Sequence, residues 1–239
     1  MNKIHSIRKF LWKLGYDLHS FEPIQSPVAR KKILFKNYKI DLIIDIGANI
    51  GHFVDAMKAD LDYSGKIVSF EPTSSAFKIL SENSKNDLNW EVFNCAIGAE
   101  SGNIEINVSE NSESSSILEI TDEHLNAAPN SKYISKEKVE VKTIDELFPK
   151  LFSPFKNIFM KIDTQGFEKN IIYGAKNSLD KISTIQLEMS ISPLYKNEAS
   201  FREMYDLMIS FGYKMVSIET GYLNQKGEML QLDAIFHHD

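Results

Sequence analysis

The stretch LIIDIGANIG, residues 42–51, decides the fold. Leu42–Ile46 is a short apolar run, which is typical of a parallel strand buried on both faces. Gly47 and Gly51 follow, and a backbone without a Cβ atom can turn tightly there and approach a ligand closely. The helix after this loop has a positive N-terminal end formed by its free amide groups. A strand, a glycine loop and a helix in this order predict a ligand site at the end of a parallel sheet.

The residues around this loop favour a nucleoside joined to an amino acid. The dinucleotide pattern G-x-G-x-x-G is absent, and Asp45 would repel a pyrophosphate but can meet an ammonium group. Glu71 ends the next predicted strand, 20 residues after Gly51. A carboxylate there can accept hydrogen bonds from both hydroxyls of a ribose. Each feature alone has an ordinary alternative. The glycine loop could be a plain strand–helix turn, and Glu71 could be a solvated carboxylate.

Apolar runs and helical patterns alternate along residues 40–239, which predicts an α/β domain with right-handed crossovers. The predicted strands are 42–46, 66–70, 91–97, 139–143, 157–162, 184–189, 214–219 and 230–236. The predicted helices are 50–59, 74–84, 144–148, one capped by Thr164, and one that begins with the capping box of Ser200 and Glu203.

Two segments depart from this alternation. Residues 98–138 form an insertion whose Ser-rich stretch, 109–121, is predicted to be a flap over the site, with a disordered surface loop as the alternative. Residues 1–39 form a helical extension. Its first helix, 1–14, is amphipathic and basic, and we expect it to pack on the flank of the domain; binding to a membrane surface or to a partner is the alternative.

Composition places the chain among ordinary globular proteins. Its 239 residues are 43% hydrophobic and 25% charged, which suits one domain with appendages. Cys95 is the one cysteine, so no internal disulfide is possible. The net charge of −6 disfavours nucleic acid as a partner. No apolar run reaches the ~18 residues of a membrane span, and no signal-peptide pattern is present. We expect a cytoplasmic monomer or homodimer without integral membrane association.

Five motifs together resemble the FkbM methyltransferase family. They are DIGANIG at 45–51, SFEP at 69–72, CAIG at 95–98, KIDTQGFE at 161–168 and DAIF at 233–236, and the resemblance covers residues 40–239. The fourth matches the family pattern K-I-D-x-(E/Q)-G-x-E. It is the most specific, because its polar residues have no role in routine strand–helix packing. Asn49 stands where other methyltransferases often have glycine, and FkbM members resemble this chain there.

The resemblance implies a Rossmann-like class I methyltransferase fold with S-adenosylmethionine as the methyl donor. Such a fold has a mostly parallel seven-stranded sheet with helices on both faces, here with a β-rich insertion. The glycine loop would surround the methionine portion, Glu71 would hold the ribose, and Cys95 and Ala96 would line the adenine pocket. The expected cofactor-binding residues are Asp45, Gly47, Ala48, Asn49, Gly51, Glu71, Pro72, Cys95, Ala96 and Asp163.

Methyl transfer to a hydroxyl needs a base that takes the hydroxyl proton. In an open α/β sheet this base lies beyond the carboxyl ends of the strands. Asp163 is the first candidate, and Glu168, Lys161 and Glu188 are further ones. Asp163 and Glu188 end neighbouring predicted strands and could bind magnesium as two oxygen ligands. We nevertheless expect no metal ligand.

The expected activity is O-methylation of a hydroxyl on a sugar or glycosylated metabolite, so the partner is a small-molecule or saccharide acceptor. A methyltransferase that acts on nitrogen or on a peptide is one alternative. A non-catalytic S-adenosylmethionine-binding module is another, and the intact carboxylates Asp163 and Glu168 argue against it. An oxidoreductase is excluded by the missing G-x-G-x-x-G pattern.

Overall fold

The computed structural model describes residues 3–18 and 20–239. Its centre is a seven-stranded sheet in the order β3-β2-β1-β7-β8-β10-β9. β10 runs antiparallel to both of its neighbours, and the other pairs are parallel. The predicted mostly parallel seven-stranded sheet is therefore confirmed. Its strands are β1 Leu42–Ile46, β2 Lys66–Phe70, β3 Trp90–Phe93, β7 Ile158–Ile162, β8 Thr184–Ser190, β9 Lys214–Thr220 and β10 Gln231–His237.

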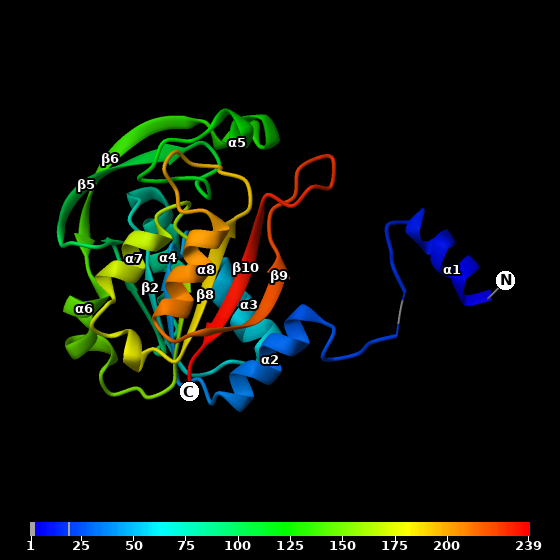
Figure 1. The fold of residues 1–239 in the computed structure, drawn as a ribbon, viewed down its shortest axis with the longest axis horizontal. Coiled ribbons are helices and arrows are strands. Elements are labelled where there is room, and N and C mark those ends of the chain that lie inside the picture. Colours follow the sequence, from blue (N-terminus) through cyan, green and yellow to red (C-terminus); the bar gives the residue numbers. More distant parts are fainter. Residues whose placement is uncertain (1–2, 19) are drawn as a thin grey trace.

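Helices cover both faces of this sheet, as predicted (Figure 1). The helices α2, α3 and α4 share a buried apolar cluster with one face. The helices α6, α7 and α8 share a second, larger cluster with the other face. The helices are α2 Pro27–Asn37, α3 His52–Leu61, α4 Ser74–Ser84, α6 Ile144–Leu147, α7 Glu168–Gly174 and α8 Phe201–Ser210.

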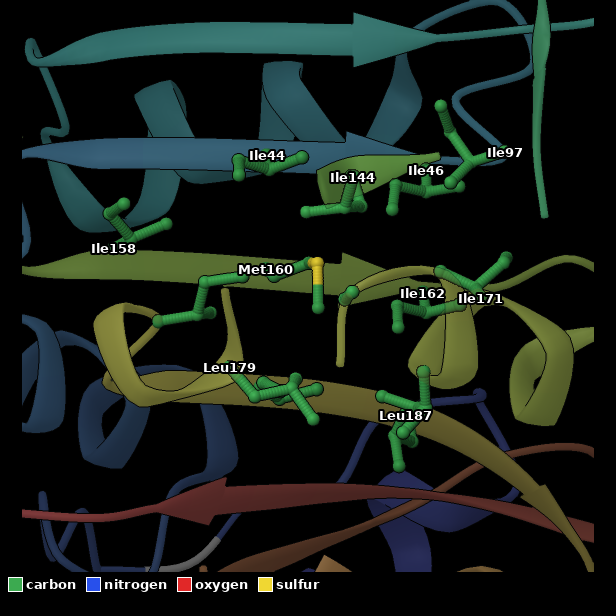
Figure 2. Close-up of a cluster of buried hydrophobic side chains, with 14 of the residues drawn as sticks. Ile44, Ile46, Ile97, Ile144, Ile158, Met160, Ile162, Ile171, Leu179 and Leu187 are labelled. Carbon is green, nitrogen blue, oxygen red and sulfur yellow. The ribbon is translucent and has the colours of Figure 1, made fainter. Parts of the chain in front are cut away.

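The central strands are buried on both faces of the sheet. Ile43 belongs to the first cluster and Ile44 to the second, because successive side chains of a strand point to opposite faces. Figure 2 shows the second cluster, in which Ile44 of β1, Met160 of β7 and Leu187 of β8 are fully buried. Burial of each such side chain stabilises the fold by about 1.5–3 kcal/mol.

The insertion and its flanking residues form a second sheet of three strands, in the order β4-β6-β5. These are β4 Ala96–Ile97, β5 Gly102–Ser109 and β6 Tyr133–Lys142, with α5 Asp122–Ala127 between β5 and β6. The prediction of one strand over 91–97 is wrong, because the chain leaves the central sheet between β3 and β4. Asn94 lies at this break, where its Nδ2 donates to the carbonyls of Glu71 at 2.9 Å and Pro72 at 3.0 Å.

Two helices begin later than predicted. Gly51, at φ 102°, still belongs to the loop, so α3 begins at His52. Thr164 does not cap α7, which begins at Glu168; its N–H and hydroxyl instead donate to the Glu168 carboxylate at 2.8 and 3.1 Å. The capping box predicted at the start of α8 is confirmed. The other predicted strands of the central sheet agree with the observed bounds to within one residue.

The described part of the N-terminal extension contains two helices, which differ in how they contact the domain. Along α1, Lys3–Trp12, the side chains of Ile7 and Phe10 are 53% and 61% exposed, and the helix lies apart from the domain (Figure 1). Its predicted packing on the domain flank is therefore wrong; residues 1 and 2 of that prediction lie outside the described residues. The following helix, α2, is the one that packs on the domain, where Lys31 Nζ lies 2.8 Å from Glu219 of β9. No helix in the described ranges is long and apolar enough to cross a membrane.

Candidate active site

A cavity of about 510 Å³ opens at the carboxyl ends of the parallel strands. This is where ligands bind in open α/β sheets. Most of the residues expected from the sequence line it: Gly47, Ala48, Asn49, Glu71, Pro72, Cys95, Ala96, Lys161, Asp163 and Glu188. Three others, Asp45, Gly51 and Glu168, are not part of its wall. The first group can touch a ligand that fills the cavity, whereas the last three are not in contact with it.

The glycine loop and the end of β7 touch each other at Gly47. This residue has φ +78°, and a Cβ atom on it would lie 1.8 Å from the carbonyl oxygen of Asp163. Its N–H donates to the carbonyl of Phe70 at 3.1 Å. No side chain larger than hydrogen fits there, so the loop can lie against both neighbouring strands only with glycine at this position.

Glu71 connects the end of β2 to the glycine loop. One of its carboxylate oxygens accepts from Asn49 N–H at 2.9 Å. The other accepts from Thr73 N–H at 2.8 Å and from the Thr73 hydroxyl at 2.6 Å. Burial raises the pKa of Glu71, and these hydrogen bonds oppose that rise. The oxygen bonded to Asn49 retains acceptor capacity for a ligand hydroxyl.

Asp45, behind the cavity wall, and Lys161, in the wall, form a buried charged cluster. Asp45 is fully buried, accepts from the Ser69 hydroxyl at 3.1 Å, and lies 3.4 Å from Lys161 Nζ. The same ammonium lies 3.3 Å from Asp163 and donates to the carbonyl of Gly47 at 3.1 Å. Burial alone would lower the pKa of Lys161, but the charges of Asp163 and Asp45 outweigh it and raise the pKa. Lys161 therefore stays charged and positions the loop and Asp163.

Glu168 stabilises the loop between β7 and α7 through hydrogen bonds. One carboxylate oxygen accepts from the N–H groups of Thr164 at 2.8 Å and Gly166 at 3.2 Å. Burial raises the pKa of Glu168 to about 7. This side chain holds the loop that carries Asp163 and Gln165, and it does not face the cavity.

Gln165 links the two carboxylates that do face the cavity. Its Nε2 donates to Asp163 at 2.8 Å and to Glu188 at 2.9 Å. Burial, followed by the charges of Asp163, Glu168 and Asp233, raises the pKa of Glu188. A carboxylate with a raised pKa that is held next to a ligand cavity is suited to accept a proton.

Hydrogen bonds from two other segments hold Gln165. From the insertion, the Ser116 hydroxyl donates to the Gln165 carbonyl at 2.7 Å, and from the segment between β8 and α8, the Tyr195 hydroxyl donates to Gln165 Oε1 at 2.7 Å. Asn49 Nδ2 donates to the Ser112 hydroxyl at 3.2 Å, which ties the insertion to the glycine loop. Five residues of the insertion line the cavity, namely Ile106, Ser112, Glu113, Ser115 and Ile117. In the structure the Ser-rich stretch thus forms part of the cavity wall.

Some parts of the site carry no distinctive pattern in the sequence. Burial raises the pKa of Cys95 to about 11, so this thiol is an uncharged wall residue. No role is predicted for Gln165 from the sequence, although it lies inside the most specific motif. The sequence also does not predict Lys31, Gln186 and Glu219, which line the cavity from distant segments. Within the described residues, no group of three or more His, Cys, Asp or Glu side chains is arranged to hold a metal ion.

Comparisons with known proteins identify the family and the fold. The family model of the methyltransferase FkbM domain matches residues 45–215. The methyltransferase FkbM of Methylobacillus flagellatus KT is 13% identical with a TM-score of 0.51; the match covers 83% of this chain and 44% of that one, so the chain spans less than half of that protein. An O-methyltransferase from Bacillus cereus, in complex with SAH, is 13% identical with a TM-score of 0.51 and coverages of 98% and 90%.

A putative O-methyltransferase from Klebsiella pneumoniae is 10% identical with a TM-score of 0.51, and the match covers all of this chain and 91% of that one. At such identities these structures establish the class I methyltransferase fold. A search of curated protein sequences found no significant match. The family match extends from the glycine loop through the Asp163 motif to β9 and so includes most of the cavity wall. The chain belongs to the FkbM family of S-adenosylmethionine-dependent methyltransferases.

Proposed function

We propose that this protein transfers a methyl group from S-adenosylmethionine to a hydroxyl of a sugar or glycosylated metabolite. The observation that carries the proposal is the pair of carboxylates, Asp163 and Glu188, joined through Gln165 on the wall of the cavity that also holds Glu71. A nucleoside site and a proton acceptor in one cavity are what methylation of a hydroxyl requires. Methyl transfer to nitrogen or to a peptide, and a purely binding role, are the alternatives.

The residues present fit the donor. Glu71 offers a buried carboxylate oxygen to ribose hydroxyls, and the bare backbone of Gly47 allows close approach of the methionine portion. Pro72, Cys95 and Ala96 offer a mostly apolar wall for the adenine ring. Asp45 acts on this site through Lys161 rather than by contact. When bound, the donor supplies a methyl group on a sulfonium, whose sulfur is a good leaving group.

The chain supplies orientation and a proton acceptor. The acceptor oxygen bonds to the methyl carbon as the carbon–sulfur bond breaks, the electron pair of that bond goes to sulfur, and the hydroxyl proton passes to Glu188 or Asp163. Gln165 donates to both carboxylates and so holds them side by side. Orientation of reactants in this way supplies much of the acceleration of a displacement.

The insertion, residues 98–138, is proposed to act as the flap over the acceptor. Its serine hydroxyls and the carboxylates opposite form a polar enclosure that suits a hydroxyl-rich acceptor. We place the catalytic domain at residues 40–239 and the extension at 1–39. A cytoplasmic location and a monomeric or homodimeric state belong to the same proposal.

The test is an acceptor screen with tritium-labelled methyl donor, in which glycosides are compared with simple phenols. We expect label in glycosides, with turnover at least 100-fold lower in Glu188→Gln and Asp163→Asn while S-adenosylhomocysteine still binds. Glu82→Gln, an exposed change on α4, is the control. Preferential labelling of phenols, or full activity of both variants, would contradict the proposal.

A further inference from the structure

Three carboxylates lie side by side across the antiparallel end of the sheet. In the strand register Asp233 of β10 is paired directly with Glu188 of β8 and with Glu219 of β9. Paired residues share a face of the sheet, and all three side chains line the cavity. Like charges placed directly opposite each other destabilise a sheet, so this row needs compensation.

Other groups of the protein compensate the negative charge of these three carboxylates only in part. Lys31 forms an ion pair with Glu219 at 2.8 Å. Asp233 receives one hydrogen bond from Gln186 Nε2 at 3.2 Å, and Glu188 receives bonds from the amides of Gln165 and Gln231. In the described part of the chain, no lysine, arginine or histidine forms an ion pair with Asp233 or Glu188. Burial and the charge of Asp163 raise the pKa of Asp233, and the hydrogen bond from Gln186 and the charge of Lys31 oppose that rise without cancelling it.

Two buried acceptor atoms in the same wall have no donor. Gln186 is only 5% exposed, and its Oε1 accepts no hydrogen bond among the described residues. The Oε1 atom of Glu219 is also buried and accepts no hydrogen bond among the described residues. Buried polar atoms are normally hydrogen-bonded, so each unsatisfied one needs an explanation. Two unpaired acceptors beside a row of carboxylates call for a ligand that donates hydrogen bonds and carries positive charge.

We propose that Gln186, Asp233 and Glu219 form a subsite for a protonated amino group of the methyl acceptor, which makes the acceptor an amino-bearing hydroxylated compound such as an amino sugar. The inference rests on the proposed function and specifies its substrate. Glu188 belongs both to the row and to the pair held by Gln165, so the amino group binds next to the hydroxyl that is methylated. An ammonium donates three hydrogen bonds, and the neighbouring side chains of Gln186 and Asp233, which are 3.2 Å apart, can accept two of them.

The test uses methyl glycosides of 2-, 3-, 4- and 6-amino hexoses, each paired with its N-acetyl derivative, titrated by calorimetry into protein saturated with S-adenosylhomocysteine. Acetylation removes the positive charge and leaves the sugar hydroxyls in place. We expect at least one amine to bind about 10-fold or more tightly than its N-acetyl partner. Asp233→Asn, which preserves side-chain size, should reduce that preference at least 5-fold, and Glu219→Gln should reduce it as well.

Glu100→Gln is the matched control, because it removes the same charge from an exposed turn between β4 and β5. Absence of binding across the panel, equal affinity for amine and N-acetyl forms, or a preference that persists in Asp233→Asn would overturn the subsite. Failure of S-adenosylhomocysteine to load in the first step would instead overturn the proposed function, so the two failures are distinguishable.

Discussion

The Tyr195 hydroxyl donates a 2.7 Å hydrogen bond to Gln165 Oε1 and thereby fixes which end of the Gln165 amide faces the carboxylates. In Tyr195→Phe this amide can rotate, since a typical hydrogen bond contributes about 1 kcal/mol. We expect turnover to fall about 5-fold to 10-fold, with affinity for S-adenosylhomocysteine unchanged. Steady-state kinetics and calorimetry check this. Tyr173→Phe, on the exposed side of α7, should leave both quantities unaltered.

Gly47 offers a test of the contact between the glycine loop and β7. An alanine there would place its Cβ 1.8 Å from the Asp163 carbonyl oxygen at a φ of +78°. We expect Gly47→Ala to abolish S-adenosylhomocysteine binding and to lower the free energy of unfolding by more than about 2 kcal/mol. Gly102→Ala is the control, because nothing lies within 4 Å of its added Cβ. Equal denaturation midpoints for the two variants would show that the loop is free to move.

Lys161 neutralises buried charge. Removal of one partner of a buried ion pair typically costs about 3–5 kcal/mol, because the other charge remains uncompensated. Lys161→Met should therefore destabilise the protein by an amount of this order in urea unfolding, and addition of Asp45→Asn should restore part of the loss. Lys196→Met removes an exposed ion pair with Glu119 and should cost less than about 1 kcal/mol. A double variant no more stable than Lys161→Met would refute the charge argument.

Glu168 should make stability depend on pH. Its pKa is about 7 in the folded protein against an ordinary value of 4.5. The folded state therefore binds more protons than the unfolded state between these values, so stability decreases as pH rises from about 4.5 through 7. The difference amounts to at most about 3 kcal/mol. Unfolding curves from pH 5 to 8 should show a flatter dependence in Glu168→Gln than in the wild type, and an identical slope would contradict this assignment.

Local sequence patterns were sufficient to predict the parts of the site that lie on contiguous segments. The glycine loop, Glu71 and Asp163 each follow a buried strand, and parallel strands bring their carboxyl ends to one edge. The pairing of Lys31 with Glu219 joins residues 188 positions apart and depends on how α2 packs on β9. No local pattern encodes such a contact.

Other differences arise from hydrogen bonds that sequence patterns do not specify. Glu168 looked like a candidate catalytic carboxylate, but the loop folds so that two backbone N–H groups point at it. Asp45 looked like a ligand contact, but Lys161 lies between it and the glycine loop carbonyl. In both cases the sequence shows an acidic residue, but tertiary packing determines where its side chain points.

The central claim is that the cavity beside Glu71 binds S-adenosylmethionine. Calorimetric titration of S-adenosylhomocysteine and of NAD⁺ into wild-type protein, Glu71→Gln and the exposed control Glu82→Gln tests it most directly. We predict micromolar binding of S-adenosylhomocysteine alone, weakened at least 10-fold in Glu71→Gln and unchanged in Glu82→Gln, with all three proteins folded by thermal unfolding. Equal affinity for NAD⁺, or unchanged binding in Glu71→Gln, would contradict the account.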